Sequence, residues 1–289
     1  MGTRTTVERR ALRLAELVGP LSCAIALLQA ACSSDDGSVL GGHGGAGAAT
    51  GMGASAANGS GGNIGIGGSG AGTPTGGNGF CNTAMNGAIR DFQASHPEME
   101  YVIEVDPGIV EPDLGADRKP VYAHGAEGTV TTHGPDTFNQ WYNDVDGVNV
   151  NIPLTISLDD VGGGVYSYDN SEFFPIDGQG WGNEGNPHNY HFTYELHASF
   201  VYQGGEVFTF TGDDDLFTFV NDKLAIDLGG VHGSMSDTID LDARAAELGI
   251  EVGQTYPLDF FFAERHTTES HFRIDTTISF IDCGPPPPA

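Results

Sequence analysis

Apolar and polar residues alternate along much of the second half of the chain, with the period of two that is typical of strands burying one face. Residues 191–202 place large apolar side chains on one face, namely Phe192, Tyr194, Leu196, Phe200 and Tyr202. Residues 271–281 repeat the pattern with Phe272, Ile274, Ile278 and Phe280. Asn221 and Asp222 separate two further runs and predict a tight hairpin turn. With glycine-rich turns and no regular alternation of strands with helices, the pattern predicts an antiparallel β-sandwich.

Three short helical segments are expected among these strands. Residues 82–96 carry Ile89 and Phe92 at helical spacing. Residues 240–249 end on a glycine that is suited to a helix C-cap. A turn of helix at residues 135–144 presents three aromatic side chains, Phe138, Trp141 and Tyr142.

The first 32 residues have the order of a secretory signal: a basic start, an apolar run from Leu17 to Ala31, and small residues before Cys32. The run is shorter and more interrupted than the ~20 apolar residues of a membrane-spanning helix. Its end, "LQAAC", resembles the lipobox of bacterial lipoproteins, which predicts lipidation of Cys32 and a place at the outer membrane or cell surface. The alternative is a secreted protein cut near Ala31. Both alternatives predict export.

Composition divides the remainder of the chain. Residues 33–80 are predicted to form a disordered tether, because 19 of the 43 residues from 37 to 79 are glycine and few of the others can bury a core. Residues 81–283 are long enough for one sizeable domain, and residues 284–289 are a proline-rich tail. Cys81 and Cys283 stand at the two borders of this domain, which in an oxidising compartment predicts a disulfide between them.

Charge narrows the range of partners. The formal net charge is -28, and removal of the signal leaves 7 basic and 37 acidic residues. Such a surface disfavours nucleic acid and anionic membranes, so that membrane contact is expected only through the lipid, and it favours divalent cations. Adaptation to a salty habitat is an alternative explanation that is compatible with cation binding.

Few positions in the sequence carry residues that could bind a metal or catalyse a reaction. Asp213, Asp214 and Asp215 stand in a row between two predicted strands, either as a solvated turn or as oxygen ligands of Ca²⁺. Among the histidines, His232 and His266 stand in glycine-rich or charged loops, whereas no compact zinc spacing occurs. The chain also lacks a nucleophile elbow and a phosphate-binding glycine loop, so we expect no enzyme. Polysaccharide hydrolysis remains the less favoured alternative.

Several motifs and their order resemble the fibro-slime domain family over residues 88 to 278, above all "GDDD", "DLGGVH" and "FFAERHTTES". That family is similar in turn to the protective-antigen-type ("PA-fourteen") β-sandwich. The resemblance implies such a sandwich, exported and concerned with carbohydrate or matrix. In sugar-binding members of the larger group, two adjacent aspartates joined by a cis peptide hold Ca²⁺, and the ion binds hydroxyls of a glycan.

The resemblance also assigns residues. Counting back from Lys223 places Asp213 and Asp214 on the metal-binding pair. Asp215, Glu264 and Glu269 are weaker candidates for metal ligands. His232 and Arg265 are candidates for the surface that contacts the ligand.

The sequence thus predicts an exported, calcium-dependent binding domain for glycans or extracellular matrix. A non-catalytic matrix or cell-contact protein with a purely structural calcium ion is the alternative. The glycan and the oligomeric state do not follow from the sequence.

Overall fold

The computed structural model describes residues 79–284. The predicted signal, the lipidation site Cys32, nearly all of the tether and the end of the proline-rich tail lie outside the described residues. Within the described range, no helix is both long and apolar enough to cross a membrane.

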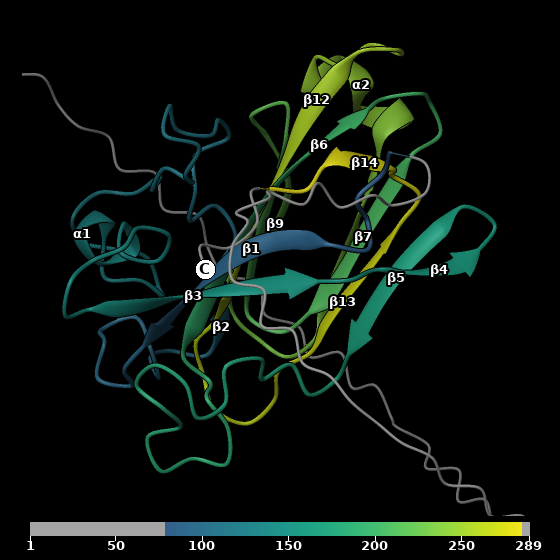
Figure 1. Ribbon diagram of the computed structural model, residues 1–289. Coiled ribbons are helices and arrows are strands. Elements are labelled where there is room, and N and C mark those ends of the chain that lie inside the picture. Colours follow the sequence, from purple (N-terminus) through teal and green to yellow (C-terminus); the bar gives the residue numbers. More distant parts are fainter. Residues whose placement is uncertain (1–78, 285–289) are drawn as a thin grey trace, which may run out of the picture. The chain divides into compact units, whose positions relative to one another are not determined.

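Strands are the main regular structure of the domain, with two short helices between them (Figure 1). The first half contains β1 (Met85–Phe92), β2 (Glu104–Val105), α1 (Pro135–Phe138), β3 (Asn149–Ile156), β4 (Asp159–Gly162), β5 (Val165–Asn170) and β6 (Phe192–Val201). The second half contains β7 (Val207–Gly212), β8 (Asp215–Val220), β9 (Lys223–Leu228), β10 (Gly230–Val231), β11 (Met235–Asp240), α2 (Leu241–Leu248), β12 (Thr255–Glu264), β13 (Phe272–Thr276) and β14 (Phe280–Asp282).

The strands form two antiparallel sheets and a short ribbon. The larger sheet has the order β3-β1-β6-β12-β8-β9, with β14 also paired to β6. The smaller sheet has the order β11-β7-β13-β5-β4 and lies to the right in Figure 1. Strands β10 and β2 pair with each other alone. The antiparallel β-sandwich predicted from the period of two is confirmed.

The main core fills the space between the two sheets. Phe210 of the smaller sheet lies 5.6 Å from Phe260 of the larger, measured between ring centroids. Phe260 in turn lies 5.5 Å from Phe272. The face of β6 that the sequence predicts is buried in this core, as is that of β13. Apolar burial of this kind is the dominant stabilising contribution to a fold.

A second core covers the opposite face of the larger sheet. Residues 93–148, here called the cover segment, pack Phe138, Trp141 and Tyr142 against that face. Tyr142 meets Phe261 of β12 with a centroid distance of 5.0 Å. The larger sheet is therefore buried on both sides, which explains why the four residues from 260 to 263 are all apolar and all buried.

The helix predicted over residues 82–96 is wrong. Residues 85–92 form β1, which pairs with β3 on one side and β6 on the other. Because both faces of this strand are covered, Ile89 and Phe92 are buried together with Arg90 and Asp91 between them. Their spacing of three therefore reflects two buried faces rather than one helical face.

The other local predictions are confirmed. Asp240 caps α2 by accepting from the Ala243 N–H, and Gly249 ends it with a left-handed φ of 66°. Asn221 and Asp222 form the two-residue turn between β8 and β9, both with positive φ.

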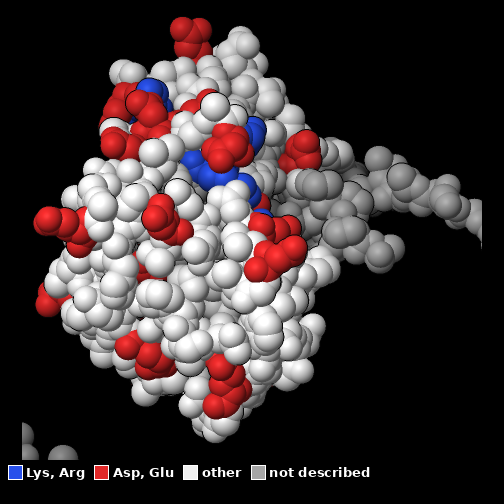
Figure 2. All heavy atoms as spheres, turned by 90° about the vertical axis from the view of Figure 1, so that its left-hand side faces the viewer, with Lys and Arg blue, Asp and Glu red and all other residues white. Residues whose placement is uncertain are grey.

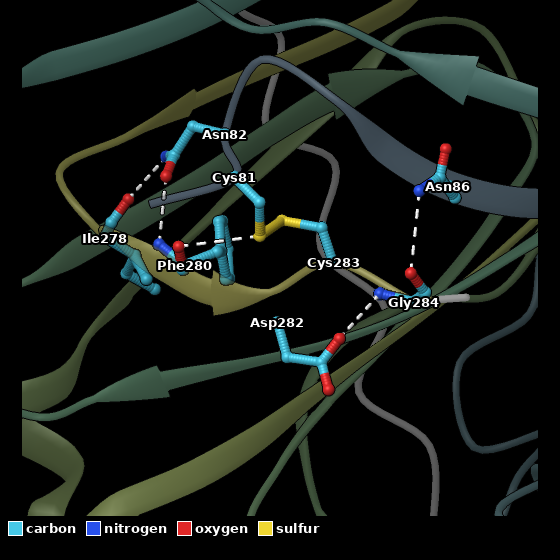
Figure 3. The surroundings of a disulfide bond; sticks show 8 residues. All are labelled: Cys81, Asn82, Asn86, Ile278, Phe280, Asp282, Cys283 and Gly284. Carbon is cyan, nitrogen blue, oxygen red and sulfur yellow. Dashed lines mark hydrogen bonds between the residues drawn. A yellow bond between two sulfur atoms is a disulfide. The ribbon is translucent and has the colours of Figure 1, made fainter. Parts of the chain in front are cut away.

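The two ends of the described domain are joined covalently. Cys81 and Cys283 form the predicted disulfide, with their Cα atoms 5.9 Å apart (Figure 3). Beside it, the Asn82 side chain donates to the carbonyl of Ile278 and accepts from the N–H of Phe280. The disulfide and these two hydrogen bonds thus hold the start and the end of the domain side by side.

Candidate functional site

The three consecutive aspartates lie where the chain crosses between the sheets. β7 ends in the smaller sheet at Gly212, and β8 begins in the larger sheet at Asp215. Asp214 makes the crossing with a φ of 51°, in the left-handed region that aspartate tolerates better than most residues. The peptide bond between Asp213 and Asp214 is trans, as is every other bond from residue 79 to 284. The cis bond implied by the resemblance is therefore wrong.

Asp215 points into the protein and pairs with Arg265. Its Oδ2 accepts from the Arg265 Nε at 2.6 Å, and its Oδ1 accepts from the Gly230 N–H at 2.7 Å. The guanidinium also donates to the carbonyl of Thr131 and lies 4.7 Å from the ring centre of Trp141. Both partners of this ion pair are 0% exposed. The expectation that Arg265 lines the ligand surface is wrong, because Arg265 links the sheet to the cover segment instead.

Asp213 and Asp214 are held by backbone donors from two loops. The Asp214 carboxylate accepts from the His232 N–H at 3.1 Å and from the Arg265 N–H at 2.8 Å. Asp213 Oδ2 accepts from the His271 N–H at 2.8 Å. Charge-assisted bonds of this kind fix carboxylates more firmly than bonds between neutral groups do. The two side chains are therefore positioned before any ligand arrives.

Two carboxylate oxygens at this site have no partner. Asp213 Oδ1 and Glu264 Oε2 are buried and accept no hydrogen bond. Burial raises the pKa of Asp213, and burial raises the pKa of Asp214 to about 6. Burial also raises the pKa of Glu264 well above its usual value, and the neighbouring Asp214 charge raises it further. Burial and the closeness of the three carboxyl groups thus disfavour their charged forms when no cation is bound.

An open cavity of about 220 Å³ leads to the aspartates. Its walls come from the crossing, from the 229–234 loop and from the 264–271 loop. The lining residues are Ile103, Asp213, Asp214, Val231, His232, Gly233, His266, Thr267, Thr268 and Glu269. The structure therefore places the predicted residues Asp213, Asp214, His232 and Glu269 together, with Glu264 buried behind them and absent from the lining.

The carboxylate oxygens at this cavity fit a hard divalent cation in part. Asp213 Oδ1 is free to coordinate, and an oxygen that already accepts one hydrogen bond keeps a second lone pair. Within residues 79–284, however, no three His, Cys, Asp or Glu side chains converge as a metal-ligand group. Ca²⁺ takes six to eight oxygens and accepts carbonyls, water and ligand hydroxyls among them. Two aspartates therefore suffice only if the remaining positions are filled by such neutral oxygens.

One ionic contact that the sequence did not reveal holds the 264–271 loop. Glu100 of the cover segment accepts from the Thr267 N–H at 3.0 Å, and its Oε1 lies 2.8 Å from the His191 Nε2. His266 lies 3.4 Å from the other oxygen. Burial alone would raise the pKa of Glu100, but the His191 and Thr267 hydrogen bonds and the histidine charges hold it below its usual value. His191 itself is buried.

A second charged group lies on the outer face of the larger sheet. Figure 2 shows lysine and arginine side chains gathered among carboxylates on one side of the molecule. Glu195 accepts from Arg90 at 2.9 Å and from Lys119 at 2.5 Å. Burial would raise the pKa of Glu195, but His197 and these two cations lower it to about 2. His197 in turn pairs with the buried Asp259 at 2.6 Å. The group fastens the cover segment to the sheet.

Part of the domain is similar to known proteins. Residues 177–285 match the model of the PA14 domain. Protein psiD of Dictyostelium discoideum is 46% identical over 193 residues, which are 62% of this chain and 38% of that protein. Protein psiQ of the same organism is 41% identical over 214 residues, which are 67% of this chain and 21% of that protein. The chain therefore spans well under half the length of these relatives.

Among solved structures, the PA14 sugar-binding domain from an RTX adhesin is similar, with a TM-score of 0.30 and 11% identity over 68% of this chain and 93% of that domain. This likeness concerns the fold alone. Together with the strand topology, the family match confirms an antiparallel sandwich of the protective-antigen type. Membership of the fibro-slime family stays a prediction.

Proposed function

We propose that this chain is an exported, non-catalytic binding protein that takes up glycans through a calcium ion held by Asp213 and Asp214. The carrying observation is that Asp213, which lines an open cavity, has a buried Oδ1 without a hydrogen-bond partner. A buried charged oxygen without a partner is costly, and a cation supplies the missing interaction. The match of residues 177–285 to the PA14 domain supports carbohydrate binding at a coarse level.

In this proposal the ion supplies positive charge and coordination positions for sugar hydroxyls. The chain's own groups orient the ligand. His232 lies on the wall beside the two aspartates and is 8% exposed. The 264–271 loop offers polar atoms from Thr267, Thr268 and Glu269. A rigid cavity with a few well-placed polar groups is typical of small-ligand sites.

Export and a lipid anchor at Cys32 complete the proposal. A tether rich in glycine behind a membrane anchor would hold the domain away from the surface and leave it free to sample ligands, with a reach of roughly 35–40 Å by random-coil scaling.

The test is a glycan array probed with the full chain, with calcium and with a chelator. We expect glycan binding that the chelator removes and that the double change Asp213→Asn and Asp214→Asn abolishes. A matched control is the adjacent pair Asp159 and Asp160, which is exposed on β4; its double change to asparagine should leave binding intact. Calcium-stabilised protein without any glycan signal would favour a purely structural ion.

A further inference from the structure

A second open cavity lies beside the ionic group of Glu195 and His197. Its volume is about 360 Å³, against about 220 Å³ for the cavity at the aspartates. The lining residues are Arg118, His197, Ala198, Ser199, Asp282 and Gly284. The two cavities share no lining residue. The second one, here called the arginine cavity, is therefore a separate candidate site.

Arg118 is the lining residue with the most unused bonding capacity. Its Nη2 pairs with the Asp259 carboxylate, and its side chain is 46% exposed. Within residues 79–284, neither its Nε nor its Nη1 finds an acceptor. By contrast, Arg244, Arg265 and Arg273 each donate from all three guanidinium nitrogens. Arg118 therefore keeps donors available for an acceptor that enters from solvent.

The backbone at Arg118 is strained. Its φ of 60° lies in the left-handed region, which is unfavourable for a residue with a side chain such as arginine. The surrounding turn enforces this conformation: the Arg118 N–H donates to the Gly115 carbonyl at 2.8 Å, and the Gly115 N–H donates to the Lys119 carbonyl at 2.9 Å. Strained residues of this kind cluster at ligand sites. The fold thus holds Arg118 at the cavity in spite of an unfavourable backbone conformation.

His197 supplies a second positive group. Its Nδ1 lies 2.6 Å from the Oδ1 of Asp259, which is 0% exposed. Burial would lower the pKa of His197, but its hydrogen bonds to Asp259 and Glu195 raise it. Glu195 already pairs with two other cations. Arg118 and protonated His197 therefore share the one buried carboxylate of Asp259, which leaves a surplus of one positive charge at the cavity.

The rest of the lining adds a hydroxyl and one carboxylate. Ser199 follows His197 by two positions on β6, so both lie on the same face of the strand. Within the described part of the chain, the Ser199 hydroxyl has no hydrogen-bond partner. Asp282 is exposed and accepts from the Gly284 N–H at 3.2 Å (Figure 3). Water and salt screen an exposed charge of this kind, so it opposes an incoming anion only weakly.

We propose that the arginine cavity binds the carboxylate group of a small acidic ligand, such as a uronic acid, without calcium. A carboxylate accepts charge-assisted hydrogen bonds from a guanidinium, and its single charge matches the single surplus charge at the cavity. A phosphate group, with nearly two charges, would exceed that surplus and be repelled more strongly by Asp282. This inference goes beyond the proposed function and does not depend on it.

The experiment is a titration of the full chain, without added calcium, with D-glucuronate, D-glucose, acetate and inorganic phosphate. We expect D-glucuronate to bind and D-glucose not to bind. Arg118→Gln should weaken D-glucuronate binding about tenfold or more, because a charge-assisted contact is lost. Asp282→Asn should strengthen it about two- to fivefold, because an opposing charge is removed. Arg273→Gln is the matched control, since Arg273 is 42% exposed and lies outside the lining.

Binding of D-glucuronate that responds to the two variants in opposite directions supports the inference. Binding of acetate as well would show that the carboxylate alone suffices, whereas D-glucuronate alone would show that the sugar ring contributes. Equal binding of D-glucose, tighter binding of phosphate, or no gain in Asp282→Asn would overturn the inference. Because Asp282 is exposed, its variant decides the matter even where Arg118→Gln does not fold. Each of these failures leaves the proposed calcium site standing, since no calcium is present.

Discussion

Asp213 and Asp215 stand two residues apart, yet we expect only the replacement of Asp215 by asparagine to lower the stability strongly. Asp215 pairs with Arg265 at 2.6 Å in a part of the interior where both side chains are 0% exposed. Asp215→Asn leaves the guanidinium buried with its full charge and without the carboxylate that it pairs with. Removing one partner of a buried ion pair costs about 3–5 kcal/mol. Asp213→Asn removes a buried charge whose Oδ1 has no partner, and it keeps an oxygen for the His271 N–H.

The difference translates into melting temperature. For a domain of this size, 1 kcal/mol shifts the midpoint by roughly 2–4 °C. We therefore expect Asp215→Asn to melt roughly 6–20 °C below the wild type. In a chelator, Asp213→Asn should melt within a few degrees of the wild type.

Thermal unfolding followed by circular dichroism, in chelator and in excess calcium, measures both effects. Calcium at a hundredfold excess over its Kd adds about 2.7 kcal/mol to the folded state. Wild type and Asp215→Asn should both gain this stabilisation, whereas Asp213→Asn should gain little or none. An Asp213→Asn protein that loses as much stability in chelator as Asp215→Asn would show that the three aspartates form one structural unit. Equal stabilisation of Asp213→Asn and wild type by calcium would falsify the proposed cation site.

Three further predictions concern other parts of the chain. Intact mass before and after alkylation should show no free thiol at Cys81 or Cys283, and alkylation of both without reductant would contradict the disulfide. The full-length chain expressed in a bacterial host should partition into detergent, and Cys32→Ser should move it to the aqueous phase; an aqueous wild type that lacks acyl mass would show simple secretion. The pKa of Glu195 falls from 4.5 to about 2 on folding, so its contribution of up to about 3 kcal/mol is present above pH 4.5 and is lost as the pH falls toward 2. Glu195→Gln should flatten the dependence of stability on pH across that window, and an unchanged loss of stability in acid would count against the ionic group. The pKa of His197 is raised despite burial, because Asp259 and Glu195 favour its charged form. The contribution of His197 to stability is therefore lost instead as the pH rises above 6.5.

The sequence predicted the strands best where one face is buried and the other is polar. β6 and β13 follow a period of two because the main core takes every second side chain. The same reasoning failed for β1, because apolar side chains occupy both of its faces: Ile89 lies in the main core, and Phe92 is buried on the opposite face. Trp141 and Tyr142 stood out in the sequence as aromatic residues, but nothing local showed that they share a core with Phe261, more than one hundred positions away.

The candidate site was predicted in part for a similar reason. The three aspartates are visible as a motif, whereas their different roles depend on where Arg265 points. Arg265 looks like a surface residue in a loop of charged and polar neighbours, and only the fold shows that it is buried over Trp141.

The bond between Cys81 and Cys283 also determines how the domain carries mechanical load. The two residues are 202 positions apart in sequence but adjacent in space. A pull between the segments that precede and follow the domain would run through one covalent link, and the sheets between them would bear no tension. A force between the preceding segment and a bound ligand would instead be transmitted through the larger sheet, from the strands beside the disulfide to the loops around Asp213. The hydrogen bonds between β1 and β6 would therefore carry the load on a ligand bound near Asp213, whereas stretching of the chain alone would leave that site unloaded.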